Sequence, residues 1–190
     1  LGHSMGVNVV LEFAHRFPEM TQALVLANGT AKHPLQTLFG GNFLEPAFGV
    51  LSQLQKLKPE WVKLGWKIQE KTPLIGQTLG VLGFNRYLVH PSDIFTYGKQ
   101  MAELSPVVLT RMMDDYKNYD ATVWLHEIKV PTLVLSGEED QITPPETQDL
   151  IHQLIPGSQL VNVQHGSHCC TLYMPDYVNL IIEKFLDQLK

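Results

Sequence analysis

The sequence is poor in cysteine, in clustered basic residues and in long apolar runs. Its 190 residues include only two cysteines, the neighbours Cys169 and Cys170, so a disulfide framework is excluded and reduced thiols are expected. No run of Lys or Arg occurs and the formal net charge is -5, which argues against a nucleic-acid partner. No stretch reaches the roughly 18 consecutive apolar residues of a membrane-spanning helix, so no integral membrane segment is expected.

Metal-ligand spacing is also lacking. Six histidines have no second His, Cys or carboxylate at a ligand spacing, and surface or packing roles suit them better: His3, His15, His33, His90, His126 and His152. We therefore expect neither a metal nor an organic cofactor. The expected location is cytoplasmic, although a leader peptide ahead of Leu1 would not be visible in this sequence. The oligomeric state stays open.

What the sequence does contain is enough apolar material for the core of one ordinary domain, since 44% of its residues are hydrophobic. Three short Val- and Leu-rich runs, at residues 23–27, 132–136 and 160–163, predict strands buried on both faces, as in parallel sheets covered by helices. Apolar residues at helical spacing predict a helix over residues 7–17, which Pro18 ends.

Two more helices are predicted near the carboxyl end. The first has Thr143 as a candidate N-cap, Pro144 at its first position and Glu146 completing a capping box. The second covers about residues 176–189, where one apolar stripe recurs at helical spacing: Val178, Ile181, Ile182, Phe185, Leu186 and Leu189.

Residues from about 30 to 119 contain no convincing strand and several helical patterns. They predict a group of helices inserted between two strands. The resulting order alternates helices and strands, so the fold class expected is α/β with an embedded helical subdomain.

The chain opens on Gly2-His-Ser-Met-Gly6, a G-x-S-x-G pattern that is typical of a nucleophile elbow. An elbow is a sharp turn from a strand into a helix with the serine at its tip. Glycines on either side leave room where a Cβ would clash with the neighbouring strand or helix. A helical pattern follows Ser4 directly, as an elbow requires.

A serine nucleophile needs a base, and the base needs an orienting acid. Two loops past predicted strands offer them. Glu138, Glu139 and Asp140 follow the strand at 132–136, while His165 and His168 follow the strand at 160–163. Asp140 and His168 are the preferred pair; Glu138 or Glu139 could replace the acid, and His165 could be the base.

These motifs resemble the α/β-hydrolase fold superfamily, the serine esterase and lipase-like enzymes with a helical cap. The matching residues are Gly2–Gly6, the run from Val130 to Gly137 with Asp140 and Pro144 after it, and His168 with Pro175 seven positions later. In that family the residue before the histidine is often glycine and the fifth residue after it often glutamate. Ser167 and Tyr173 stand at those positions here.

The resemblance implies a parallel sheet flanked by helices, with an inserted cap. Residues 1–30 would carry the elbow, its helix and the next strand of the core, residues 31–122 the helical cap, and residues 123–190 the carboxyl-terminal part of the core. The strands that precede the elbow in the family would be missing from this chain. The sheet would then keep an unpaired edge and one oxyanion donor would be absent, so we expect the chain alone to fold poorly and to be inactive.

The implied function is a serine hydrolase that cleaves a carboxylic ester or related acyl bond through Ser4, Asp140 and His168 by an acyl-enzyme. The backbone N–H of Met5 would supply one donor to the oxyanion. The substrate would be a small molecule with an apolar acyl group. An acyltransferase, a thioesterase or a C–C bond hydrolase of the same fold is the enzymatic alternative, and a non-catalytic ligand-binding protein is the alternative from another class.

Overall fold

A computed structural model describes residues 1–37, 44–71 and 74–190. Its centre is a four-stranded parallel sheet in the order β1-β2-β3-β4. The strands are β1 (Gly2–His3), β2 (Leu24–Ala27), β3 (Thr132–Gly137) and β4 (Gln159–Val163). The carboxyl ends of these strands therefore meet at one edge of the sheet, which is where the candidate serine, acid and histidine follow them in the chain.

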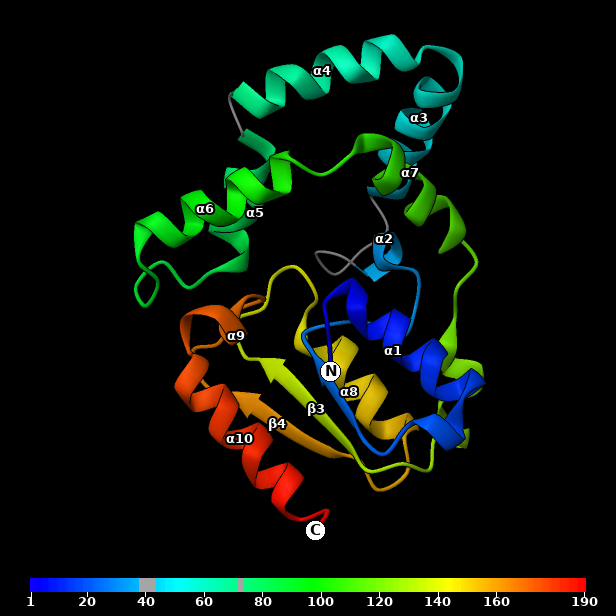
Figure 1. The fold of residues 1–190 in the computed structure, drawn as a ribbon, viewed down its shortest axis with the longest axis vertical. Helices are drawn as coiled ribbons and strands as arrows, with labels where there is room; N and C mark the ends of the chain where they lie inside the picture. The colour runs from blue at the N-terminus through cyan, green and yellow to red at the C-terminus, as the bar shows by residue number, and fades with distance from the viewer. Residues whose placement is uncertain (38–43, 72–73) are drawn as a thin grey trace.

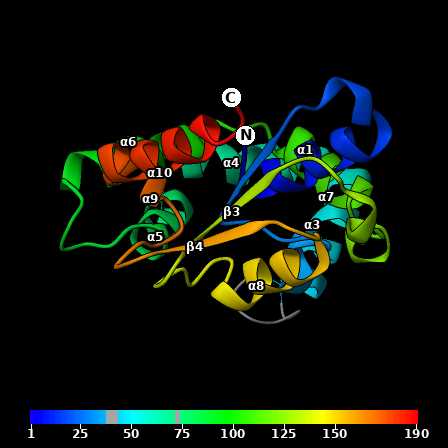
Figure 2. The same cartoon turned by 90° about the horizontal axis from the view of Figure 1, so that it is seen from below.

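Helices cover both faces of the sheet. On one face, α1 (Met5–Arg16) and α8 (Pro145–Leu154) pack against every second side chain of β2 and β3. The buried cluster formed there includes Val7, Leu11, Leu26, Val134 and Ile151. On the other face α9 (Cys170–Tyr173) and α10 (Pro175–Asp187) cover the intervening residues, in a cluster that includes Val25, Leu135, Val163, Val178 and Phe185. Figure 2 shows α8 and α10 on opposite sides of β3 and β4. The period-two alternation of the strands thus builds two separate cores.

A group of helices lies between β2 and β3 in the sequence. They are α2 (Pro34–Thr37), α3 (Leu44–Leu57), α4 (Pro59–Lys71), α5 (Leu74–Gly83), α6 (Pro91–Ala102) and α7 (Pro106–Asp115). In Figure 1 the helices α3 to α7 form a layer above the sheet and its flanking helices. The segment leaves and rejoins the core at one place, because Lys32 and Asp120 form an antiparallel bridge and the Ala121 N–H donates to the Ala31 carbonyl at 2.8 Å.

Short 3₁₀ turns complete the chain: η1 (Pro18–Met20), η3 (Ala121–Val123) and η4 (Leu125–Glu127). The helical segment expected at 31–122 includes residues 38–43 and 72–73, which lie outside the described residues. Among the helices that the structure describes, none has both the length and the apolar character that crossing a bilayer requires.

Three expectations about these elements are wrong in detail. Helix α8 begins at Pro145, one residue later than expected, so its N-cap is Pro144, whose ring has no group that can cap the helix; the Thr143 hydroxyl lies before the N-cap and donates to Asp140. Strand β4 is only partly buried, since it lies at the edge of the described sheet and exposes Gln159. Helix α10 ends at Asp187, which leaves Leu189 beyond the helix and exposed.

Candidate active site

Ser4 lies at the tip of the turn between β1 and α1. Its backbone has a φ of 54° and a ψ of -126°, a combination that non-glycine residues rarely adopt and that is often found where a backbone is held for function. The Ser4 N–H donates to the Ala27 carbonyl at 3.0 Å, which ties the turn to the end of β2. A Cβ built on Gly2 would lie 2.7 Å from Val10 Cγ2, so the strand and helix approach each other here as only glycine allows. A Cβ built on Gly6 has no atom of the described residues within 4 Å. The clash expected for a side chain at Gly6 is therefore not found among the described residues.

The structure brings Ser4, His168 and Asp140 into one hydrogen-bonded chain. His168 Nε2 is 2.9 Å from Ser4 Oγ, and His168 Nδ1 is 2.9 Å from Asp140 Oδ2. Ser4 comes from the β1–α1 turn, Asp140 from the loop after β3 and His168 from the loop after β4. Both members of the His168–Asp140 pair have almost fully buried side chains. Three residues far apart in the sequence therefore meet at the carboxyl edge of the sheet.

The Asp140 carboxylate is held by its own loop. Its Oδ1 accepts the N–H groups of Ile142 at 2.8 Å and Thr143 at 2.9 Å, and its Oδ2 accepts the Thr143 hydroxyl at 2.8 Å. An acceptor fixed in this way favours the His168 tautomer that carries its proton on Nδ1. Nε2 is then free to accept the hydrogen of Ser4 Oγ, which is the arrangement a general base needs.

The backbone of His168 is anchored by two side chains that sequence reasoning missed. Its carbonyl accepts the Nδ2 group of Asn28 at 2.8 Å and the Nε2–H of His3 at 2.7 Å. The Oδ1 of Asn28 accepts the Gly137 N–H at 2.8 Å. The Asn28 amide therefore joins the end of β3, which precedes Asp140, to the loop after β4, which carries His168. Asn28 has a φ of 45° directly after β2. An asparagine immediately after a predicted strand was the available signal, because Asn tolerates the left-handed region.

His3 lies at the site, next to His168, and its packing role agrees with the one expected from the sequence. Its ring lies against the ring of His168, with 4.9 Å between the centroids. Burial lowers the pKa of His3, and the neighbouring His168 lowers it further. His3 is therefore a neutral packing and hydrogen-bonding partner of the histidine loop at neutral pH.

The alternative acid and base residues pair with one another at the surface. His165 Nδ1 is 3.3 Å from Glu139 Oε1, and the His165 N–H donates to Glu138 Oε2 at 3.1 Å. The His165 and Glu139 side chains are 62% and 48% exposed. The structure therefore places His168 in contact with Ser4 and Asp140 in contact with His168, and it places these three residues at the surface.

Met5 is the first residue of α1. Its N–H has no acceptor within the helix, because the first N–H groups of a helix lack intrahelical partners. It follows Ser4 directly, so this N–H is the candidate for the oxyanion donor that the resemblance implies.

The vicinal cysteines are free and buried, and they pack in different directions. Cys170 belongs to the cluster between the sheet and α10. Cys169 contacts Phe84 and Val89 of the helical segment. Burial raises the pKa of both thiols, that of Cys169 to about 12. Neither thiol is therefore suited to nucleophilic chemistry at neutral pH.

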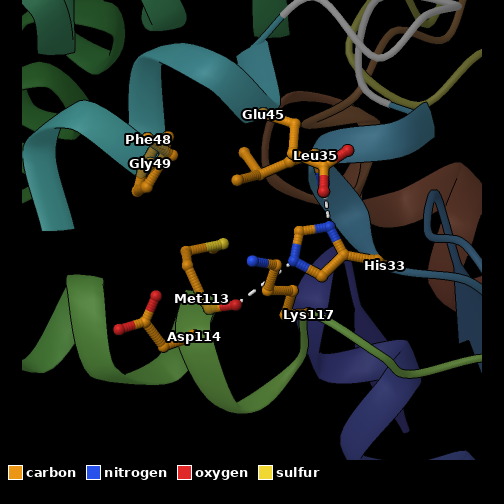
Figure 3. A pocket seen from close by; sticks show the side chains of 8 residues that line it. All are labelled: His33, Leu35, Glu45, Phe48, Gly49, Met113, Asp114 and Lys117. Atoms are coloured by element: carbon orange, nitrogen blue, oxygen red, sulfur yellow. Dashed lines mark hydrogen bonds between the residues drawn. The ribbon is translucent and has the colours of Figure 1, made fainter. Parts of the chain in front are cut away.

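A cavity of about 50 Å³ lies where the helical segment joins the core (Figure 3). The ring of the buried His33 spans this junction. Its Nδ1 accepts the Leu35 N–H and its Nε2–H donates to the Met113 carbonyl of α7, both at 3.2 Å. Both ring nitrogens are occupied, so His33 connects two backbone segments, in line with the packing role expected for it.

Comparison with known proteins agrees with this architecture. A family model described as the alpha/beta hydrolase fold matches residues 105–173, a range that contains both Asp140 and His168. Protein ABHD8 of Homo sapiens is 24% identical over 186 residues, which are 98% of this chain and 38% of that protein. A pimeloyl-[acyl-carrier protein] methyl ester esterase of Neisseria meningitidis serogroup B is 25% identical over 174 residues, or 88% of this chain and 60% of the esterase.

The solved structure of a thermophilic esterase from Thermogutta terrifontis superposes with a TM-score of 0.77 at 21% identity, covering 99% of this chain and 64% of the esterase. The chain thus spans about two fifths of the length of the human relative and under two thirds of the two esterases. The parallel sheet, the elbow geometry and these matches define the fold. The family-model match, the similarity to ABHD8 and the structural similarity to esterases together support the α/β-hydrolase fold superfamily for this chain.

Proposed function

We propose that the protein is a serine hydrolase that cleaves a carboxylic ester, or a related acyl bond, with Ser4 as nucleophile, His168 as base and Asp140 as orienting acid. The observation that carries this proposal is the unbroken hydrogen-bonded chain from Ser4 Oγ through His168 to Asp140, with both links at 2.9 Å. The esterase names of two similar proteins support the ester class.

The reaction follows from this arrangement. His168 Nε2 takes the proton of Ser4 Oγ while Oγ attacks the substrate carbonyl carbon, and Asp140 stabilises the imidazolium that forms. The Met5 N–H donates to the developing oxyanion. His168 then returns the proton to the leaving alkoxide, which leaves an acyl group on Ser4. Water attacks the acyl-enzyme with His168 again as base, releasing the acid and restoring the serine.

The substrate proposed is a small molecule with an apolar acyl group. Residues 31–122 would act as the cap of a lipase-like enzyme, and α3 to α7 would face the acyl chain. An acyltransferase differs only in the acceptor that attacks the acyl-enzyme, so the ratio of free acid to transferred product distinguishes the two reactions. A ligand-binding protein of the same fold would show neither product.

Hydrolysis of p-nitrophenyl esters of increasing chain length, measured on the full-length protein, tests the proposal. Asp140→Asn disturbs the His168 tautomer and should lower kcat by roughly 10⁴-fold. Asp149→Asn makes the same change in α8, at a half-buried residue outside the hydrogen-bonded chain, and should leave kcat unchanged. His168→Ala should abolish turnover while His165→Ala retains most of it. A folded wild-type protein that hydrolyses none of these esters would favour the ligand-binding alternative.

A further inference from the structure

The loop that carries His168 is attached to the helical segment at the Gly83 carbonyl, and Asn85 Nδ2 adds a bond to the His165 carbonyl at 3.1 Å. Gly83 is the last residue of α5, and its carbonyl accepts the Cys169 N–H at 2.7 Å and the Ser167 hydroxyl at 2.8 Å. The final carbonyls of a helix lack partners within the helix. The core supplies two hydrogen-bond donors to the Gly83 carbonyl, and both come from the residues on either side of His168.

Tyr173 extends this attachment. Its hydroxyl oxygen accepts the Ser167 N–H at 2.6 Å and lies 3.0 Å from Ser167 Oγ and 3.2 Å from the His165 carbonyl. The single hydroxyl proton of Ser167 is directed to Gly83, so the Tyr173 proton is left for Ser167 Oγ or for His165. The Tyr173 ring also contacts the ring of Phe84, the residue after Gly83, at 5.8 Å between centroids. We call the Gly83 carbonyl, Ser167 and Tyr173 the loop latch.

The end of α5 at Gly83 is closely packed against two loops of the candidate site. A Cβ built there would lie 3.3 Å from Cys169 Sγ and 3.4 Å from Ile142 Cδ1. Cys169 follows His168, and Ile142 lies two residues after Asp140. The end of α5 therefore contacts both the histidine loop and the acid loop.

The two side chains of the loop latch stand where the sequence departs from the usual pattern of the superfamily. A glycine at position 167 would have no hydroxyl for the Gly83 carbonyl. A glutamate at position 173 would have no ring to lie against Phe84. Ser167 and Tyr173 contact each other, so they act as one hydrogen-bonded unit.

We propose that Ser167 and Tyr173 are positioning residues through which α5 holds His168 in line with Ser4. The proposal rests on the hydrolase function proposed above. It makes the alignment of the base depend on the position of α5 on the core. If α5 moves away from the core, the bonds to Gly83 break, and the loop carrying His168 is then held by Asn28 and His3 at the His168 carbonyl.

Steady-state kinetics with p-nitrophenyl acetate test this role, because so small an ester makes little contact with the cap. Ser167→Ala and Tyr173→Phe should each lower kcat per folded molecule by about tenfold with KM within about twofold, since small misplacements of a catalytic group are costly. The double variant should lose little more than either single variant, because the two side chains act through one network. Ser158→Ala removes a hydroxyl that also bonds a backbone carbonyl, but in the turn between α8 and β4, and should keep the wild-type kcat.

Amide hydrogen exchange at Cys169, measured by NMR, reports on the loop latch independently of activity. Its N–H bonds to Gly83, so exchange should accelerate in Ser167→Ala and stay at the wild-type rate in Ser158→Ala. Wild-type kcat in Ser167→Ala, or strictly additive losses in the double variant, would overturn the proposal. If the wild-type protein hydrolyses no ester, the hydrolase function fails and the exchange measurement alone decides: acceleration supports the loop latch, and unchanged exchange refutes it.

Discussion

Asn28 bridges two loops of the candidate site, and removing its side chain should lower the free energy of unfolding more than removing any other single polar side chain. Asn28 is fully buried, and it bonds the Gly137 N–H and the carbonyls of Ser167 and His168 at 2.8 to 3.1 Å. Asn28→Ala removes these three bonds and the contact of Nδ2 with Cys170 Sγ at 3.2 Å. The Ser167 and His168 carbonyls keep other donors, from Cys170 and His3.

The magnitude follows from these contacts. Three buried neutral hydrogen bonds are worth about 1 kcal/mol each. Alanine at a φ of 45° adds about 1 kcal/mol of backbone strain. The free energy of unfolding should therefore fall by about 3–4 kcal/mol, which lowers the urea midpoint by about 1.5–2 M for a typical slope near 2 kcal/mol per M. Most small domains would remain folded in water after such a loss.

Urea unfolding followed by circular dichroism measures this change. Asn85→Ala is the matched control, because Asn85 also makes side-chain bonds to two acceptors, Glu139 and the His165 carbonyl, but at the exposed surface. It should cost less than about 1 kcal/mol. Equal losses for the two variants would refute the reasoning, since burial would then not decide the cost.

Two further predictions come from buried titratable groups. The pKa of His3 is lowered from its ordinary value of 6.5, so the unfolded state binds the proton more tightly; the stability His3 contributes is complete above pH 6.5 and is lost as pH falls towards the folded-state pKa. His3→Gln keeps a donor for the His168 carbonyl and should lose less stability than wild type between pH 7 and 5, as urea midpoints would show; identical losses would contradict the assignment. The raised pKa values of Cys169 and Cys170 predict slow reaction of the native protein with Ellman's reagent at pH 8 and reaction of both thiols in guanidinium. Rapid release of two equivalents from the native protein would be inconsistent with this burial.

The strands could be predicted from sequence because their signal is local. Continuous Val and Leu runs at 23–27 and 132–136 need no knowledge of the rest of the chain, and β2 and β3 match them within one residue at each end. The nucleophile elbow was equally visible, since its glycine, serine and following helix are contiguous. The start of α8 was not, because the Thr143 hydroxyl had two possible partners. Only the folded chain shows that it bonds Asp140 rather than the helix end.

The residues that hold the loop carrying His168 could not be predicted from the sequence for a different reason. Asn28 and His168 are 140 positions apart, and Gly83 and Ser167 are 84 apart. Nothing local marks a hydrogen bond across such distances. The unusual residues at 167 and 173 were recognised as departures, but their contact with each other and with α5 appears only once the loop after β4 is placed beside the helical segment.

Reaction with a fluorophosphonate, followed by mass-spectrometric mapping of the adduct, tests the central claim most directly. If Ser4 is the nucleophile, one phosphonyl group forms on Ser4 of the folded protein. Ser4→Ala then gives no adduct, and His168→Ala reacts much more slowly. A folded wild-type protein that stays unmodified, or an adduct that persists at full rate in Ser4→Ala, would contradict the claim that Ser4 is an activated nucleophile.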